Sequence, residues 1–81
     1  MRPDDLRLRG KRVTVVGLGL EGVDLVRFAA SCGACVTVSD KRPADRLNTM
    51  IEKVANLPVE LSLGSNNTAD ITRADLVLVS Q

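Results

Sequence analysis

The run GLGLEG, Gly17–Gly22, carries glycines at a spacing typical of a turn that offers bare backbone to a phosphate. A strand-like segment, RVTVV, precedes the run, and a helix-like segment, VDLVRFAAS, follows it. In this context Gly17 allows a tight turn, Gly19 lets a phosphate approach, and Gly22 lets the helix pack on the strand. The alternative is a glycine turn that only packs the helix against the sheet. The spacing favours nucleotide binding, with NAD as the first candidate.

Asp40 ends the next strand-like segment, where an acid commonly accepts hydrogen bonds from ribose hydroxyl or base N–H groups. Lys41 and Arg42 follow it directly. They either contact the base, ribose or phosphate of a nucleotide, or they are solvated charges ahead of a helix. These residues support a nucleotide site without choosing the nucleotide.

Glu21 places a carboxylate inside the glycine run, where it would repel a diphosphate if it pointed inward. Its favourable position is outward, over the positive end of the following helix. We therefore expect Glu21 to face solvent and backbone N–H groups alone to hold the phosphates.

The two cysteines, Cys32 and Cys35, form the motif CGAC. A zinc site needs about four ligands, and the sequence has no histidine and no other cysteine. A redox motif activates its thiol at the start of a helix, whereas Cys32 is expected at the end of one, with Gly33 as its cap. We expect both thiols to be small core residues.

Length and composition restrict the class of protein. The chain has 81 residues, a net charge of +1, 44% hydrophobic residues and a single aromatic residue, Phe28. These values predict one small domain, residues 1–81, with an aliphatic core, and they give no electrostatic case for a nucleic-acid or membrane partner. The N-terminus lacks the apolar segment of a secretory signal, and no apolar run is long enough to span a bilayer. A cytoplasmic location is expected.

Strand-like and helix-like segments alternate along the chain, which predicts an α/β fold with a parallel sheet. Strands are expected at 12–16, 34–40, 58–64 and 75–80, and helices at 21–31, from about Pro43 onward, and from Asn67 or Thr68. The third strand alternates apolar and polar residues, which indicates a sheet edge. The fourth is almost continuously apolar, so we expect it to be buried on both faces.

Short right-handed connections predict a three-layer, Rossmann-like sheet in the order 3-2-1-4, truncated after the fourth strand. The first and fourth strands then flank the point where the direction of strand addition reverses, and ligands bind beyond the carboxyl ends there. The glycine turn, Asp40 and Ser80 would meet at this edge. Because the chain stops at Gln81, on the lip of this site, we expect it to be a fragment.

The segments KRVTVVGLGLEGVDLVRFAASCGACVTVSDKRP, LPVELSLGSNN and ADLVLVS together resemble the N-terminal domain of the Mur ligases. The resemblance is strongest to the branch that adds D-glutamate to UDP-N-acetylmuramoyl-L-alanine. It implies a bacterial, cytoplasmic, three-domain enzyme of peptidoglycan synthesis. It further implies that ATP and Mg²⁺ serve to form an acyl phosphate on the precursor, which the amino acid then attacks. The Rossmann-like domain would hold UDP and not a nicotinamide cofactor.

The resemblance also implies roles for individual residues. Backbone N–H groups around the diphosphate would come from Leu18, Gly19, Leu20, Glu21 and Gly22. Asp40 would accept a hydrogen bond from uracil, and Lys41 and Arg42 would line the base. Ser80 corresponds to the serine that opens the family's SPG turn, although Gln81 stands where that pattern has proline.

On this resemblance the residues that bind ATP, Mg²⁺ and the amino acid lie outside the chain, so it is not expected to be catalytic alone. Its partners would be the UDP precursor and the remaining ligase domains. Two alternatives remain at this point. One is an NAD(P)-binding domain of an oxidoreductase or regulatory subunit, and the other is a stand-alone binding domain.

Overall fold

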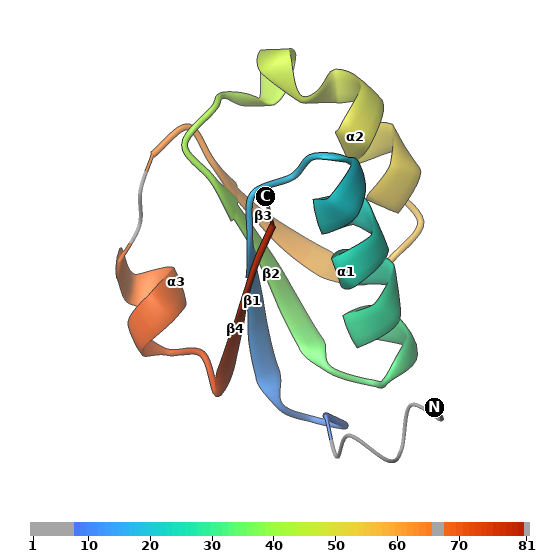
Figure 1. Cartoon of the computed structure of the whole chain (residues 1–81), viewed down its shortest axis with the longest axis vertical. Helices are drawn as coiled ribbons and strands as arrows, with labels where there is room; N and C mark the ends of the chain where they lie inside the picture. Colours follow the sequence, from blue (N-terminus) through green and yellow to red (C-terminus); the bar gives the residue numbers. More distant parts are fainter. Residues whose placement is uncertain (1–7, 66–67, 81) are drawn as a thin grey trace.

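The computed structural model describes residues 8–65 and 68–80, in which strands and helices alternate as predicted (Figure 1). The elements in chain order are β1 (Arg12–Val16), α1 (Leu20–Ser31), β2 (Cys35–Asp40), the 3₁₀ turn η2 (Ala44–Arg46), α2 (Asn48–Val54), β3 (Val59–Leu63), α3 (Thr68–Thr72) and β4 (Leu76–Val79). Asn67, the other predicted start of the short third helix, lies outside the described residues.

The four strands form one parallel sheet in the order β3-β2-β1-β4, which confirms the predicted topology. The central strand β1 pairs with β2 and β4, so that Val13 lies opposite Val36 on one side and Leu76 on the other. Because all strands are parallel, their carboxyl ends meet at one edge of the sheet. The segments that follow β1, β2 and β4 are therefore brought together there.

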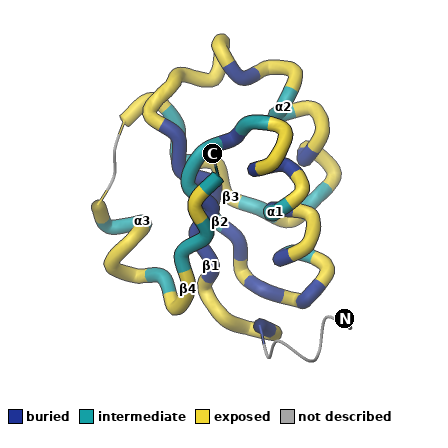
Figure 2. Tube along the Cα trace, in the orientation of Figure 1, coloured by how far each residue is buried: buried dark blue, intermediate teal, exposed yellow. Residues whose placement is uncertain are grey.

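Helices α1 and α2 cover one face of the sheet, and α3 lies on the other (Figure 1). Alternate residues of the two central strands face α1 and form an aliphatic core. Its strand members are Val13, Val15, Val36 and Val38, and its α1 members are Val23, Val26 and Ala29. Figure 2 shows the buried residues along β1, β2 and the inner side of α1. The aliphatic core that the composition predicts is thus confirmed.

The sheet face toward α3 is more polar. Thr14 on β1 is buried and donates from Oγ1 to the backbone carbonyl of Asp70 on α3, at 2.6 Å. Pairing places Thr14 opposite Thr37, and Thr37 opposite Glu60. A hollow of about 670 Å³ lies over these strands beside α3. Its lining includes Arg12 and Cys35, which begin β1 and β2. The hollow therefore lies at the amino ends of these strands, away from the glycine turn at their carboxyl ends.

The second helix begins later than predicted. The sequence places its start near Pro43, but η2 comes first and α2 begins only at Asn48. Between them Leu47 has φ −121° and ψ 12°, which are not helical values, while its side chain is 2% exposed. The chain therefore interrupts the helix at a residue that is almost completely buried.

The prediction that β4 is buried on both faces is wrong. Leu76 and Val79 are 38% and 64% exposed, because β4 pairs only with β1 and forms one edge of the sheet. The strand β3 forms the other edge, as its polar residues predicted. A continuous apolar run thus forms an edge strand here, and among the described residues it has a neighbouring strand on one side only.

The cysteines differ from each other in burial. Cys32 is 1% exposed and caps the end of α1, and Gly33 follows it with φ +81°, as expected for a helix terminus. Cys35 is exposed, so the prediction that both thiols are core residues is wrong for it. It begins β2 opposite Arg12, on the less covered face.

Across 8–65 and 68–80 no group of three or more His, Cys, Asp or Glu residues is placed to hold a metal ion, and no helix is long and apolar enough to cross a membrane.

Candidate functional site

The predicted site residues meet at the carboxyl edge of the sheet. Gly17 follows β1, and its N–H donates to the carbonyl of Ser39 on β2, at 2.8 Å. Ser80 follows β4, and its N–H donates to the carbonyl of Val16 at the end of β1, also at 2.8 Å. The parallel ladders therefore continue one residue past the strands and fix the positions of the glycine turn and Ser80.

Gly17 and Gly22 are required by the fold itself. Gly17 has φ +96°, in the left-handed region that favours glycine. A Cβ on Gly22 would lie 2.1 Å from the carbonyl oxygen of Gly17, a distance that no side chain tolerates. The absence of a side chain at Gly22 thus lets α1 start directly against the end of β1, as the sequence predicts.

Gly19 is different, because nothing in the protein requires a glycine there. Its φ of −100° and ψ of −164° are extended values that any residue adopts, and a Cβ at this position would meet no atom of the described residues within 4 Å. A glycine with an ordinary conformation and open space beside it leaves room for a bound group. This space lies at the start of α1.

The start of α1 leaves its first N–H groups without helical partners. Gly19 is the N-cap residue, it supplies no side-chain cap, and the helical ladder opens with Val23 N–H to Gly19 O at 2.9 Å. N–H groups before that point face outward along the helix axis, at its positive end. The arrangement can bind an anion through backbone alone.

Leu18 contributes to this site in another way. Its side chain is completely buried, and its N–H donates to Oδ2 of Asp40 at 2.9 Å. In this structure the Leu18 N–H is engaged with a carboxylate and is not free for a diphosphate. The other N–H groups that the resemblance implied, from Gly19 to Gly22, are not used in this way.

The Asp40 carboxylate is buried, at 6% exposure, and is surrounded by donors. Besides Leu18 N–H, it accepts the backbone N–H of Arg42 at 2.9 Å and two guanidinium bonds, from Nε at 3.0 Å and from an Nη at 2.7 Å. The guanidinium bonds, together with the Leu18 and Arg42 N–H groups, hold the pKa of Asp40 well below its usual value, and burial opposes this only partly. Asp40 is therefore an anion across the physiological pH range.

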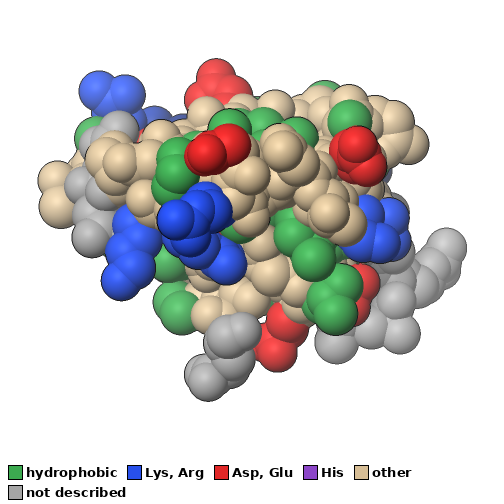
Figure 3. Space-filling view, turned by 90° about the horizontal axis from the view of Figure 1, so that it is seen from above, with side chains coloured by type: hydrophobic (Ala, Val, Ile, Leu, Met, Phe, Trp, Pro, Cys, Tyr) green, Lys and Arg blue, Asp and Glu red, His purple; other side chains and the backbone are tan. Residues whose placement is uncertain are grey.

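Arg42 and Lys41 differ in their contacts. The Arg42 side chain is 51% exposed and forms a 2.7 Å ion pair with Asp40, whereas Lys41 is exposed. Figure 3 views this edge of the molecule from above and shows Lys and Arg side chains gathered near its middle, beside acidic ones. The sequence thus correctly placed cationic side chains at this edge, but it did not indicate that Arg42 bonds to Asp40.

Two cavities lie beside the turn, and Arg42 borders both. The first, of about 360 Å³, lies over the ends of β1 and β2 and is lined by Val16, Gly17, Ser39, Asp40 and Lys41. The second, of about 440 Å³, lies between Leu18 and Gly19 on one side and residues 45–50 on the other. Sequence reasoning missed these η2 and α2 residues, because their position depends on the interruption at Leu47 and no local signal marks it.

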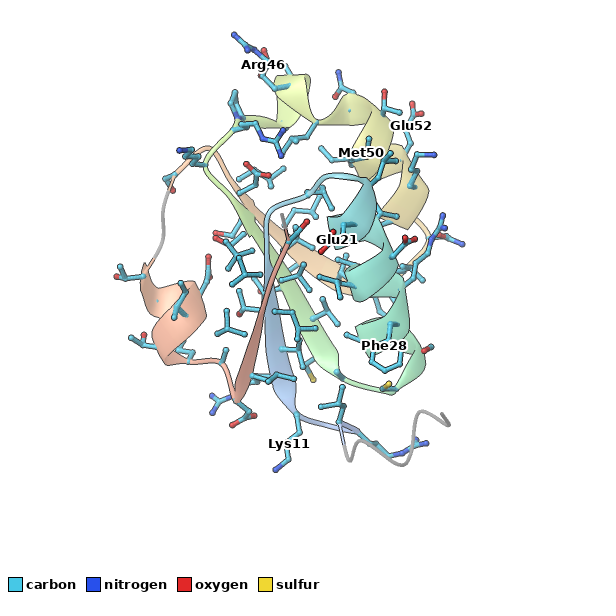
Figure 4. The ribbon with its side chains drawn as sticks, in the orientation of Figure 1. Lys11, Glu21, Phe28, Arg46, Met50 and Glu52 are labelled. Atoms are coloured by element: carbon cyan, nitrogen blue, oxygen red, sulfur yellow. The ribbon has the colours of Figure 1, made fainter. Side chains whose placement is uncertain are left out.

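The outer residues of the turn are less enclosed. Leu20 is 68% exposed, and Glu21 is exposed in the first turn of α1, in agreement with the predicted outward position (Figure 4). Neither residue lines the two cavities. By contrast the Ser80 hydroxyl is buried beside Gly17 and Gly22 and has no hydrogen-bond partner among the residues that the structure describes. Its oxygen is enclosed by the turn and is not exposed to a ligand in this structure.

Comparisons with known proteins agree with this geometry. The family model of the Mur ligase MurD-like N-terminal domain matches residues 11–81. UDP-N-acetylmuramoylalanine–D-glutamate ligase of Trichlorobacter lovleyi is 44% identical over 75 residues, which make up 93% of this chain and 17% of that enzyme. The enzyme of the same name from Bdellovibrio bacteriovorus is 38% identical over 73 residues, or 90% of this chain and 16% of the relative.

A third ligase of this name, from a Roseiflexus species, is 40% identical over 75 residues, again 90% of this chain and 16% of the relative. The chain therefore spans about one sixth of the length of the curated relatives it matches. Since the family model extends over almost all of the sequence and includes the glycine turn, Asp40 and Ser80, the chain belongs to the family of MurD-like Mur ligase N-terminal domains.

Proposed function

We propose that the chain binds the uridine diphosphate end of UDP-N-acetylmuramoyl-L-alanine, as one domain of a ligase that adds D-glutamate to this precursor. The relatives' name supplies the precursor and the amino acid. The observation that carries the proposal is the open space at Gly19, which the protein's own packing does not need. A diphosphate in that space would lie against the N-terminal N–H groups of α1.

The proposed contacts follow from the geometry of the edge. The N–H groups of Gly19–Gly22 hold the diphosphate at the positive end of α1. Asp40, Lys41 and Arg42 border the cavity over the ends of β1 and β2, which we assign to the base. A carboxylate suits uracil because the N3–H of the ring is a donor.

The Glu21 side chain takes no part in these contacts. It is exposed on the outer side of α1 and lines neither cavity, so its charge is kept from the diphosphate. At the positive end of the helix it stabilises α1 by about 0.3–1 kcal/mol. The backbone is thereby left as the main binder of the phosphates.

For the whole enzyme we propose an ADP-forming, cytoplasmic ligase of three domains in peptidoglycan synthesis. Phosphoryl transfer from ATP, with Mg²⁺, would convert the precursor carboxylate to an acyl phosphate, and the amine of D-glutamate would displace phosphate to form the amide. We assign these steps to parts of the enzyme that this chain, at about one sixth of its relatives' length, does not span.

Isothermal titration calorimetry with UDP-N-acetylmuramoyl-L-alanine, UDP and NADH tests the binding proposal. We expect both uridine nucleotides to bind and to compete with each other for one site, and NADH to bind at least tenfold more weakly. Binding of NADH in preference to UDP would contradict the proposal and favour a nicotinamide cofactor. Inorganic sulfate at the same ionic strength is the control for non-specific attraction to the helix terminus.

A further inference from the structure

The Asp40 carboxylate has no acceptor position left for a ligand. Its Oδ1 accepts the backbone N–H and the Nε–H of Arg42, and its Oδ2 accepts Leu18 N–H and a terminal N–H of Arg42. A carboxylate offers about four acceptor positions in all. A base N–H therefore reaches Asp40 only if one of these four donors leaves.

The four donors are not equally fixed. Two are backbone groups, one in the glycine turn and one directly after β2, and both are held by the fold. The other two belong to the Arg42 guanidinium, whose side chain is 51% exposed and is able to turn into solvent. If it leaves, each carboxylate oxygen gains one free position, while Leu18 N–H and Arg42 N–H keep the carboxylate in place.

The released guanidinium borders a second place where an anion would bind. Arg42 borders the cavity that contains Gly19 and the start of α1, as well as the cavity over Asp40. A diphosphate at Gly19 would thus lie in a cavity that Arg42 already lines. Guanidinium groups bind phosphate in the same forked geometry as carboxylate.

We propose that Arg42 exchanges its partner when ligand binds, from the Asp40 carboxylate to the diphosphate. This inference rests on the proposed function and adds a selection rule to it. A base alone must break the ion pair with no replacement for the guanidinium, whereas a diphosphate supplies the replacement and frees Asp40. The site consequently selects ligands that carry both an N–H donor and a diphosphate, and the two parts bind cooperatively.

The two halves of the ligand, added separately, test this coupling. Uridine carries the base without phosphate, and pyrophosphate carries the phosphates without a base. We expect saturating pyrophosphate to tighten uridine binding by about five- to tenfold in calorimetric titrations, and uridine to tighten pyrophosphate binding by the same factor, because coupling is reciprocal. Uridine is neutral, so direct charge attraction between the probes does not account for the effect.

Variants of two arginines identify the residue responsible. In Arg42→Ala, Asp40 is already free, so uridine should bind more tightly than to the wild type and pyrophosphate should no longer change its affinity. Arg46→Ala removes the same charge from the border of the same cavity, but Arg46 does not bond to Asp40 and points outward in Figure 4. This control should weaken pyrophosphate binding less than Arg42→Ala does, and it should keep the coupling.

Several outcomes distinguish this inference from the function on which it rests. If uridine and pyrophosphate bind independently in the wild type, or if Arg42→Ala keeps the coupling, the exchange of partners is wrong.

If Arg42→Ala fails to fold in thermal melts, Arg42→Lys replaces it. A single ammonium cannot span both carboxylate oxygens, so the coupling should fall by at least half. If UDP binds but uridine binds to no variant, the exchange is also wrong. If UDP and pyrophosphate do not bind, the proposed function itself fails.

Discussion

The glycine turn has two regions that are built for different purposes. In the packed region, Gly17 and Gly22 lie against each other and against Ser80, and a Cβ on Gly22 would overlap the Gly17 carbonyl at 2.1 Å. In the open region, a Cβ on Gly19 would meet no atom of the described residues within 4 Å, and Glu21 is exposed. The comparison teaches that one glycine motif meets a requirement of folding at two residues and leaves open space, where we propose that the ligand binds, at a third.

The largest expected effect is on the packed region. Gly22→Ala forces α1 away from the end of β1, and overpacking of this kind costs about 1–3 kcal/mol or more. We expect the free energy of unfolding in urea to fall by at least that amount, with loss of the folded state as the extreme result. An unchanged urea midpoint would contradict the division into two regions.

The open region should respond in the opposite way. In Gly19→Ala the backbone angles suit alanine, so the free energy of unfolding should stay the same or rise by about 0.4–1 kcal/mol. The new methyl group occupies the ligand's space, and we expect UDP affinity to fall by about tenfold or more in calorimetry. Equal affinity in this variant would show that the diphosphate does not bind at Gly19.

Acid should weaken the link between the glycine turn and β2. Asp40 has a folded-state pKa below its usual value, so its stabilising contribution is present at neutral pH and is lost as pH falls below about 5. We expect the free energy of unfolding to decrease more steeply with acidification in the wild type than in Asp40→Asn, where this group does not titrate. Parallel curves in chemical denaturation between about pH 5 and pH 2 would contradict this prediction.

The smallest effect is expected at Glu21. Glu21→Ser removes an exposed charge from the first turn of α1, which should lower the free energy of unfolding by about 0.3–1 kcal/mol. UDP affinity should be unchanged or slightly higher, because the nearby repulsion is gone. A large loss of affinity would mean that the carboxylate contacts the ligand directly, and the outer side of α1 would then belong to the site.

Much of the fold was predictable because its signals are local. Valine-rich strands, the glycines after β1 and the spacing of strands and helices led to the sheet order that the structure confirms. The predictions failed where burial depends on neighbours. Leu76 and Val79 read as core residues in the sequence, yet β4 is an edge strand, and Cys35 lies on the less covered face of the sheet.

The sequence predicted which residues gather at the carboxyl edge of the sheet, but not the hydrogen bonds between them. The sequence indicated that Gly17–Gly22, Asp40 and Ser80 share one edge, because parallel strands bring their carboxyl ends together. It gave no sign that Asp40 holds Leu18 N–H and the Arg42 guanidinium at the same time. The bond from Leu18 joins residues 22 positions apart in the chain. The guanidinium bonds join residues only two positions apart, but they depend on how the Arg42 side chain rotates.

The sequence by itself determined the order of elements, the aliphatic core and the presence of a glycine turn with an acid on the next strand. These features follow from the periodicity of apolar residues and from the backbone freedom of glycine, which act over a few residues. Only the tertiary structure decided which glycine the fold needs and which leaves space for a ligand. It alone also showed that Leu18 and Arg42 together occupy the acceptor positions of Asp40. The glycine contacts and the Leu18 bond depend on atoms that meet only after the strands have paired, and the guanidinium bonds depend on side-chain rotation.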